Sequence, residues 1–259
     1  MLLCIDIGNT NIKLGVFNGD ALSYTWRIST DRSNLRDEYA MLILSLFQTE
    51  GVKVSDISGC AISSVVPPLT QEFVEFCQHY LGLEPVLLRP DTVTGIRINT
   101  DIPGEVGSDL VMNALGAKQL FSGPMIIVGM GTATTFTAIS AAGDLEGVAI
   151  APGLLASANS LVSSTSTLPR VALAQPKTAI GKNTIASLQA GLVWGFAALV
   201  EGLVKRMQVE LGGHATVIAT GGLANVVIPE TGIIQAVEPN LVLLGLKAMY
   251  ELNQKSARG

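Results

Sequence analysis

The sequence of 259 residues predicts an α/β protein built as two similar halves. In each half a hydrophobic strand runs into a glycine-containing turn and a second strand, as DIGNTN in the first half and GMGTAT in the second. When the two motifs are aligned, Gly8 falls on Gly131. Further strands and helices follow each hairpin, which is typical of α/β folds. The repeat predicts a domain of residues 1–120 and a domain of residues 121–259, with a cleft between them.

In the first half, β-branched and alternating apolar residues predict strands, and apolar residues three and four apart predict helices. The predicted elements are strands over 2–8, 12–17 and 21–28, a helix over 36–51, a strand over 57–66, a helix to about residue 81 and a short strand around Val86. Gly51 marks the end of the first helix, and Pro67-Pro68 ends the fourth strand.

The second half follows a loop and a helix within residues 94–123. The predicted elements are two strands within 124–140, a third near 145–150, helices at about 153–162 and 183–209, a strand, glycine turn and helix within 215–225, a strand over 233–237 and a final helix from Leu241. The most apolar run, 190–200, is too short to span a bilayer and is predicted as a buried helix. Its Gly191 and Gly195 are expected to let another helix approach closely.

Composition excludes several classes of protein. Hydrophobic residues make up 48% and charged residues 14%, which indicates a packed globular chain. The net charge of −5, without a basic tract, argues against nucleic acid as a partner. The three cysteines lie in apolar stretches and are expected to be reduced, and the N-terminus lacks a basic signal region, so we expect a cytoplasmic protein with no membrane partner. The two histidines stand alone, which gives a zinc site or a Ser-His-Asp triad little support.

The first hairpin is the strongest candidate site. A tight turn alone would explain Gly8 and Asn9, but not an acid among strand residues or a lysine just past the turn. Asp6 is a candidate to face Mg²⁺, which keeps much of its water shell. The turn offers donors to phosphate oxygens, and Lys13 could neutralise developing charge. The candidate residues are Asp6, Gly8, Asn9, Thr10, Asn11 and Lys13.

Three other segments carry candidate residues, and each has a plainer interpretation. The second hairpin offers Thr132, but it is also a common hydroxyl-rich turn. Gly221 and Gly222 open a helix whose N-terminus could meet an anion beside a flat adenine, although strand-Gly-Gly-helix is a common packing device. Asp109 lies in the first turn of a predicted helix, where it could complement the helix dipole or act as a general base toward an acceptor hydroxyl.

Taken together, the motifs resemble one family. DIGNTNIK, AISSVVPPLT, PGEVGSD, GTATTF, IAPGL, IGKNT and IATGGLA stand in the order found in type III pantothenate kinases, which belong to the acetate kinase, sugar kinase, Hsp70 and actin superfamily. The resemblance runs from Met1 to about Tyr250. It implies two ribonuclease-H-like domains, a homodimer, and ATP-dependent phosphorylation of pantothenate to 4'-phosphopantothenate, the first step of coenzyme A synthesis.

The resemblance also implies roles for single residues. Asp6 to Lys13 would handle the phosphates of ATP and Mg²⁺, and Thr132 would contact ATP from the second hairpin. Asp109 would be the base. The substrate-binding residues would be Gly107, Ser108, Asp109, Leu110 and Thr184, the last across or near the dimer contact.

The chain departs from the family pattern at two candidate positions. The family usually reads Gly-Ala-Asp-Arg where this chain has Gly107-Ser108-Asp109-Leu110, so a partner for the substrate carboxylate is absent there. Gly129 replaces an aspartate that binds a monovalent cation (K⁺ or NH₄⁺) in the family. Two alternatives therefore stay open. The chain could be a kinase of the same fold for another small hydroxylated metabolite, or a nucleotide-binding relative without catalysis.

Overall fold

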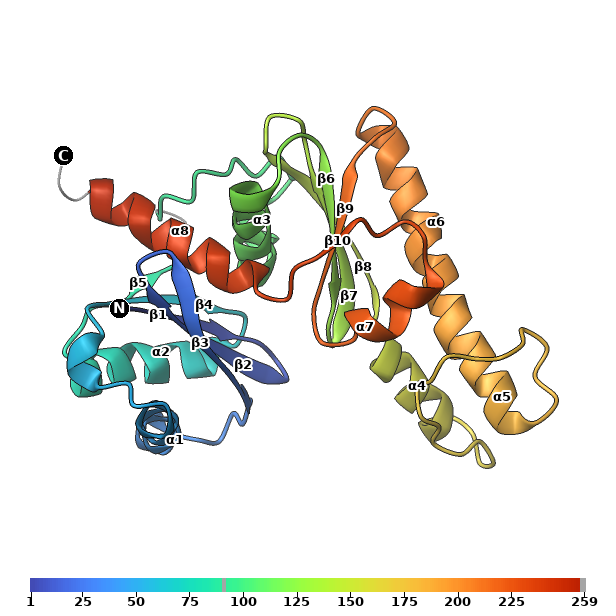
Figure 1. Cartoon of the computed structure of the whole chain (residues 1–259), viewed down its shortest axis with the longest axis horizontal. Coiled ribbons are helices and arrows are strands. Elements are labelled where there is room, and N and C mark those ends of the chain that lie inside the picture. Colours follow the sequence, from blue (N-terminus) through green and yellow to red (C-terminus); the bar gives the residue numbers. More distant parts are fainter. Residues whose placement is uncertain (90–91, 257–259) are drawn as a thin grey trace. The chain divides into compact units, whose positions relative to one another are not determined.

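The computed structural model describes residues 1–89 and 92–256, which form two compact units (Figure 1). The first unit contains Met1–Arg97, Asp101–Leu120 and the C-terminal segment from Leu241, and the second contains Ile98–Thr100 and Phe121–Asn240. Each unit is built around its own five-stranded mixed sheet.

The sheet of the first unit has the order β3-β2-β1-β4-β5. Its strands are β1 (Leu2–Ile7), β2 (Asn11–Asn18), β3 (Ala21–Ser29), β4 (Gly59–Ser64) and β5 (Val86–Leu87). The first three strands are antiparallel, and β4 and β5 run parallel to β1. The helical segments are α1 (Arg36–Thr49), η1 (Val54–Asp56), α2 (Pro67–Phe76), the π-helical η2 (Cys77–Leu81), η3 (Pro103–Glu105), α3 (Ser108–Leu120) and α8 (Leu241–Ser256).

The two faces of this sheet have different partners. The odd-numbered residues of β1 are fully buried in a core shared with α1 and α2. On the other face, Gly15 lies opposite Cys4, and a side chain at Gly15 would come within 2.7 Å of Leu243 on α8. Because cross-strand partners point to the same face, α8 covers the face that carries Cys4 and Asp6.

The second sheet repeats this plan in the order β8-β7-β6-β9-β10. Its strands are β6 (Met125–Met130), β7 (Ala133–Ile139), β8 (Leu145–Pro152), β9 (Thr216–Thr220) and β10 (Ala236–Val237). Three antiparallel strands are again followed by two parallel ones. The helical segments are α4 (Leu154–Ser163), α5 (Thr184–Gln189), the π-helical η4 (Ala190–Trp194), α6 (Gly195–Glu210), α7 (Ala224–Val227) and η5 (Ile228–Glu230).

The longest helical stretch agrees with the helix that the sequence predicts over about 183–209. Residues Thr184–Glu210 form 27 helical residues, with the length and mean hydropathy (1.5 over 18 residues) of a membrane span. One side of the stretch packs into the core of the second unit, where Phe196 and Val200 belong to the same buried cluster as Val217 of β9. Figure 1 shows α6 running along this sheet. The contacts are those of a core helix.

The C-terminal helix differs from the sequence-based boundary. The sequence assigns residues 121–259 to the second domain, but α8 packs against α3 and the first sheet. Conversely, residues 98–100 join the second unit, where the Asn99 N–H donates to the Leu145 carbonyl at 2.8 Å. Both differences arise from contacts between segments far apart in the sequence, which local patterns do not encode.

Candidate functional site

A row of polar side chains crosses the first sheet. Asp6 on β1 lies opposite Lys13 on β2 and opposite Ser63 on β4, and Lys13 lies opposite Arg27 on β3. Directly opposed residues point to the same face of a sheet. Asp6, an acid within an otherwise apolar strand, therefore stands between a cation and a hydroxyl.

The first turn of α3 is attached to this row. The Ser63 hydroxyl donates to the Ser108 hydroxyl at 3.1 Å, and the Ser108 hydroxyl donates to the Ser64 carbonyl at 2.9 Å. The Gly107 carbonyl accepts from the Leu110 N–H at 3.0 Å and starts the helix. These bonds hold the helix turn that carries Asp109 at the carboxyl end of β4.

Both carboxyl groups of this site have raised pKa values. The pKa of Asp6 is raised to about 7, first by burial and then by the charge of Asp109, against the opposing effects of the Ser63 hydroxyl and Lys13. Burial also raises the pKa of Asp109, against the backbone N–H groups of Leu110 and of Asp109 itself. Both carboxylates are thus poorly solvated, and each is stabilised by a nearby cation or by binding a proton.

The turn of the first hairpin is tight and presents polar side chains to solvent. The Gly8 N–H donates to the Asn11 carbonyl at 3.1 Å, and a Cβ at Gly8 would lie 2.9 Å from that oxygen, so only glycine fits. Asn9, Thr10 and Asn11 are exposed. The first unit therefore brings the candidate residues of the first hairpin and Asp109 to the same end of one sheet.

In the second unit, the second hairpin and the glycine turn lie next to each other. The Gly131 N–H donates to the Ala133 carbonyl at 3.1 Å, and Thr132 at the tip is exposed. Gly221 has a φ of +100°, and a Cβ there would lie 2.5 Å from the Met130 carbonyl oxygen at the end of β6. Glycine is required at this position because other residues rarely adopt that φ and no side chain would fit. Gly222, next in the turn, is exposed.

Leu110 and Gly129, the two residues that depart from the family pattern, both lie in apolar or tightly packed surroundings. Leu110 is 7% exposed and packs as a core residue, so it offers no group to an anion. Gly129 lies opposite Thr135, and a Cβ at Gly129 would lie 2.6 Å from the Thr135 hydroxyl oxygen. The next hydroxyl along β7, that of Thr134, is buried and has no hydrogen-bond partner among the described residues.

Thr184 lies in the second unit, as the first residue of α5. The preceding Asn183 caps this helix by accepting a hydrogen bond from the Ala186 N–H at 2.9 Å. Thr184 itself is exposed.

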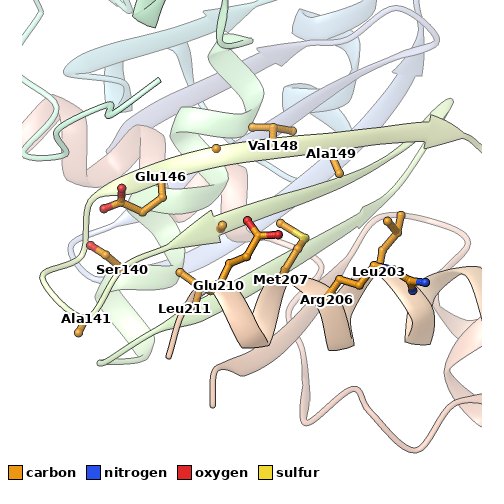
Figure 2. Close-up of a pocket in the computed structure, with 12 residues that line it drawn as sticks. Ser140, Ala141, Glu146, Val148, Ala149, Leu203, Arg206, Met207, Glu210 and Leu211 are labelled. Atoms are coloured by element: carbon orange, nitrogen blue, oxygen red, sulfur yellow. The ribbon is translucent and has the colours of Figure 1, made fainter. Parts of the chain in front are cut away.

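A pocket of about 650 Å³ lies elsewhere in the second unit, between the β7–β8 hairpin and α6 (Figure 2). It is lined by apolar residues and glycine together with Ser140, Glu146, Arg206 and Glu210, and by none of the predicted site residues. Within residues 1–89 and 92–256, no three His, Cys, Asp or Glu residues gather as a metal site.

Sequence reasoning missed the residues that support the first site. Ser63 and Arg27 acquire their places through strand register, and Ser63 is joined by contacts between β4 and α3 to Ser108, which the sequence did name as a candidate. The only available signal was the hydroxyl pair in AISSVV at the end of a predicted strand.

Comparisons with known proteins give a consistent result. The family model for type III pantothenate kinase matches residues 2–206. The type III pantothenate kinase of Roseiflexus sp. (strain RS-1) is 49% identical over 98% of this chain and 100% of its own length, and that of Moorella thermoacetica is 46% identical over 98% and 100%. These matches cover both units.

Solved structures at low identity share the fold. The activator of the 2-hydroxyisocaproyl-CoA dehydratase from Clostridium difficile matches with a TM-score of 0.61 at 14% identity, covering 99% of this chain and 96% of its own. The (R)-2-hydroxyglutaryl-CoA dehydratase component A from Acidaminococcus fermentans matches with a TM-score of 0.59 at 15% identity, covering 100% and 99%. The predicted actin-like α/β fold is thus confirmed, and the full-length relatives show that the chain belongs to the type III pantothenate kinase family, whose members are ATP-using kinases.

Proposed function

We propose that this chain transfers the terminal phosphoryl group of ATP to the primary hydroxyl of pantothenate and forms 4'-phosphopantothenate for coenzyme A synthesis. The observation that carries the proposal is the pair of poorly solvated carboxyl groups, Asp6 and Asp109, at one end of the first sheet. Phosphoryl transfer needs a cation at the phosphates and a base at the acceptor, and two such carboxylates supply both roles.

Asp6 is assigned to Mg²⁺. The ion binds through one or two carboxylates and keeps several waters, so a single acid beside a phosphate-binding turn suits it. The raised pKa of Asp6 reflects a carboxylate that lacks a full counter-charge in the protein alone. Bound Mg²⁺ would neutralise charge on the phosphates. The turn of the first hairpin, Lys13, Thr132, Gly221 and Gly222 are assigned to the nucleotide.

Asp109 is assigned to the base. Its pKa is raised by burial, which makes the carboxylate a better proton acceptor than an exposed aspartate. The helix turn at Gly107–Leu110 would hold the substrate. Thr184 would contact the substrate from a homodimer, and exposed apolar residues beside it, Ile180 (81%) and Ile185 (55%), support an interface there. The three free, buried cysteines favour a reducing, cytoplasmic setting.

A second candidate function is supported by Leu110. Its buried, apolar side chain cannot pair with the carboxylate of pantothenate, so the substrate of this chain could be another small hydroxylated metabolite. The first candidate has stronger support, because relatives of 46–49% identity over nearly the whole chain are type III pantothenate kinases.

The test is ATP consumption with pantothenate and with a panel of small hydroxy acids and alcohols, with Mg²⁺ present. The proposal expects pantothenate to be the preferred acceptor. Preferred turnover of another acceptor would favour the second candidate. ATP binding without turnover of any acceptor would contradict both.

A further inference from the structure

The loop after β3 braces the turn of the first hairpin. The Thr30 hydroxyl donates to the Gly8 carbonyl at 2.6 Å, and the Thr30 N–H donates to the Thr10 carbonyl at 3.0 Å. These two bonds fix the position of residues 30–32 relative to the turn. A side chain that follows Thr30 is therefore held beside whatever the turn binds.

Arg32 makes the next contact. Its Nη2 donates to Asn9 Oδ1 at 2.8 Å, and both side chains are exposed. An arginine side chain has only donors, so it selects the oxygen end of the Asn9 amide. The NH₂ group of the Asn9 side chain then points away from Arg32. With its oxygen held by Arg32, Asn9 is prepared to donate to an anion.

The charge of Arg32 is not balanced by the protein. Among the described residues, no carboxylate lies within ion-pair distance of it. The neighbouring Asp31 carboxylate accepts from the Ser33 N–H and hydroxyl at 3.0 and 2.6 Å. By contrast, Arg36 pairs with Asp37 at 2.7 Å and with Glu75 at 3.7 Å. Arg32 thus keeps four of its five N–H donors beyond the bond to Asn9.

The sheet that carries the first hairpin has two further cations. Lys13 and Arg27 stand directly opposite each other on β2 and β3. Lys13 also lies opposite Asp6, so this row of the sheet carries two cations and one carboxylate. The first hairpin and β3 thus form an anion-binding edge with more cations than the hairpin alone supplies.

We propose that Arg32 is a nucleotide-binding residue that orients Asn9 and contacts the phosphate chain of ATP with its remaining guanidinium N–H groups. The inference rests on the proposed function for the identity of the anion. Arg32 would recognise the phosphate chain by charge-assisted hydrogen bonds from two N–H groups to phosphate oxygens, for which arginine is better suited than lysine.

The experiment compares Arg32→Gln, Arg32→Lys and Asn9→Asp with the control Arg89→Gln, in which an exposed arginine of the same unit is changed. Calorimetry measures binding of ATP with Mg²⁺ and of adenosine, and steady-state kinetics give KM for ATP and for pantothenate. Arg32→Gln is expected to weaken ATP binding about tenfold and to change adenosine binding and the pantothenate KM less than twofold. Arg32→Lys should recover only part of the loss.

Asn9→Asp separates positioning from charge. The aspartate can still accept from Arg32, but it turns an anionic oxygen toward the phosphates in place of an N–H donor. We expect ATP binding to weaken at least as much as in Arg32→Gln, with unchanged adenosine binding and no loss of thermal stability.

The inference is overturned if Arg32→Gln binds ATP as tightly as Arg89→Gln does, or if adenosine binding falls in parallel with ATP binding. These results are distinct from a failure of the proposed function. A wild-type protein that binds ATP but does not phosphorylate pantothenate contradicts the proposed function, while the binding comparison still decides the role of Arg32.

Discussion

Asp6 illustrates how one side chain connects stability and function. Its carboxyl group has a pKa near 7 in the folded chain, against 3.8 for an ordinary aspartate, so it binds a proton more tightly when the chain is folded. Proton binding by Asp6 therefore stabilises the folded state. This stabilisation is fully present below about pH 4 and is lost as the pH rises through about 7. At neutral pH without a cation, Asp6 destabilises the protein on the order of a few kcal/mol.

Asp6→Asn is accordingly expected to stabilise the protein without nucleotide and Mg²⁺. The melting temperature of the variant should exceed that of wild type at pH 8, and the difference should vanish near pH 4, where both side chains are neutral. Asp101→Asn, at an exposed position of the same unit, serves as the control and should not change the melting temperature. A variant that melts at or below the wild-type temperature at pH 8 would show that the raised pKa of Asp6 is wrong.

Gly129 predicts that the activity depends little on monovalent cations. The strand offers no carboxylate at the position where the resemblance implies a monovalent-cation site, and the polar group nearest to a Cβ at Gly129 is the Thr135 hydroxyl. Replacing Na⁺ by K⁺ in the assay should therefore change kcat less than about twofold, because a lone hydroxyl binds such an ion weakly. Strong activation by K⁺ would contradict this interpretation.

The candidate acids were predictable from the sequence because an acid in an apolar strand and an acid in a first helix turn stand out locally. Ser63 and Arg27 were not predictable. Their roles depend on which residue of β1 or β2 they oppose, and a shift of one residue would turn each to the other face.

The contact between α3 and α8 brings two helix backbones close together. A Cβ at Gly116 would collide with the Leu241 carbonyl, and a Cβ at Gly245 would collide with the Met112 carbonyl. The spacing of Gly191 and Gly195 predicted such an approach there, but among the described residues no atom beyond their own stretch of helix lies within 4 Å of a Cβ built at either glycine. Within the single chain the close approach is made at Gly116 and Gly245, and glycine spacing alone does not reveal which helices meet.

Gly245→Ala should therefore destabilise the protein. The added methyl group must push α8 away from α3, at about 1–3 kcal/mol or more for an overpacked contact. Gly191→Ala is the matched control and should be neutral or stabilising, since alanine favours helix more than glycine. Chemical denaturation measures both. Equal stability of the two variants would mean that the helices do not approach as closely as described.

For the whole molecule, the repeat in the sequence was sufficient to predict two similar sheets. Each sheet has the same order of three antiparallel and two parallel strands. The position of the C-terminal helix was not predictable, because α8 packs with segments more than a hundred residues earlier in the chain. The first unit is therefore built from both ends of the sequence.

The proposed homodimer leads to an expectation for the assembly. Sedimentation velocity should give a particle of twice the 27.1 kDa chain mass. Ile185→Asp should weaken the assembly and raise the pantothenate KM, because Ile185 is 55% exposed and follows Thr184. Met41→Asp, at a 70% exposed position in the first unit, should do neither. A monomer that turns over pantothenate at the full rate would contradict the proposed role of Thr184.

The central claim is that Asp109 accepts the proton of the pantothenate hydroxyl during phosphoryl transfer from ATP. The most direct measurement is formation of 4'-phosphopantothenate by wild type and by Asp109→Asn in a single turnover, followed by mass spectrometry. Wild type should form the product, and the variant should form it at least about 100-fold more slowly, with unchanged affinity for ATP. Product formation by Asp109→Asn at the wild-type rate would contradict the account.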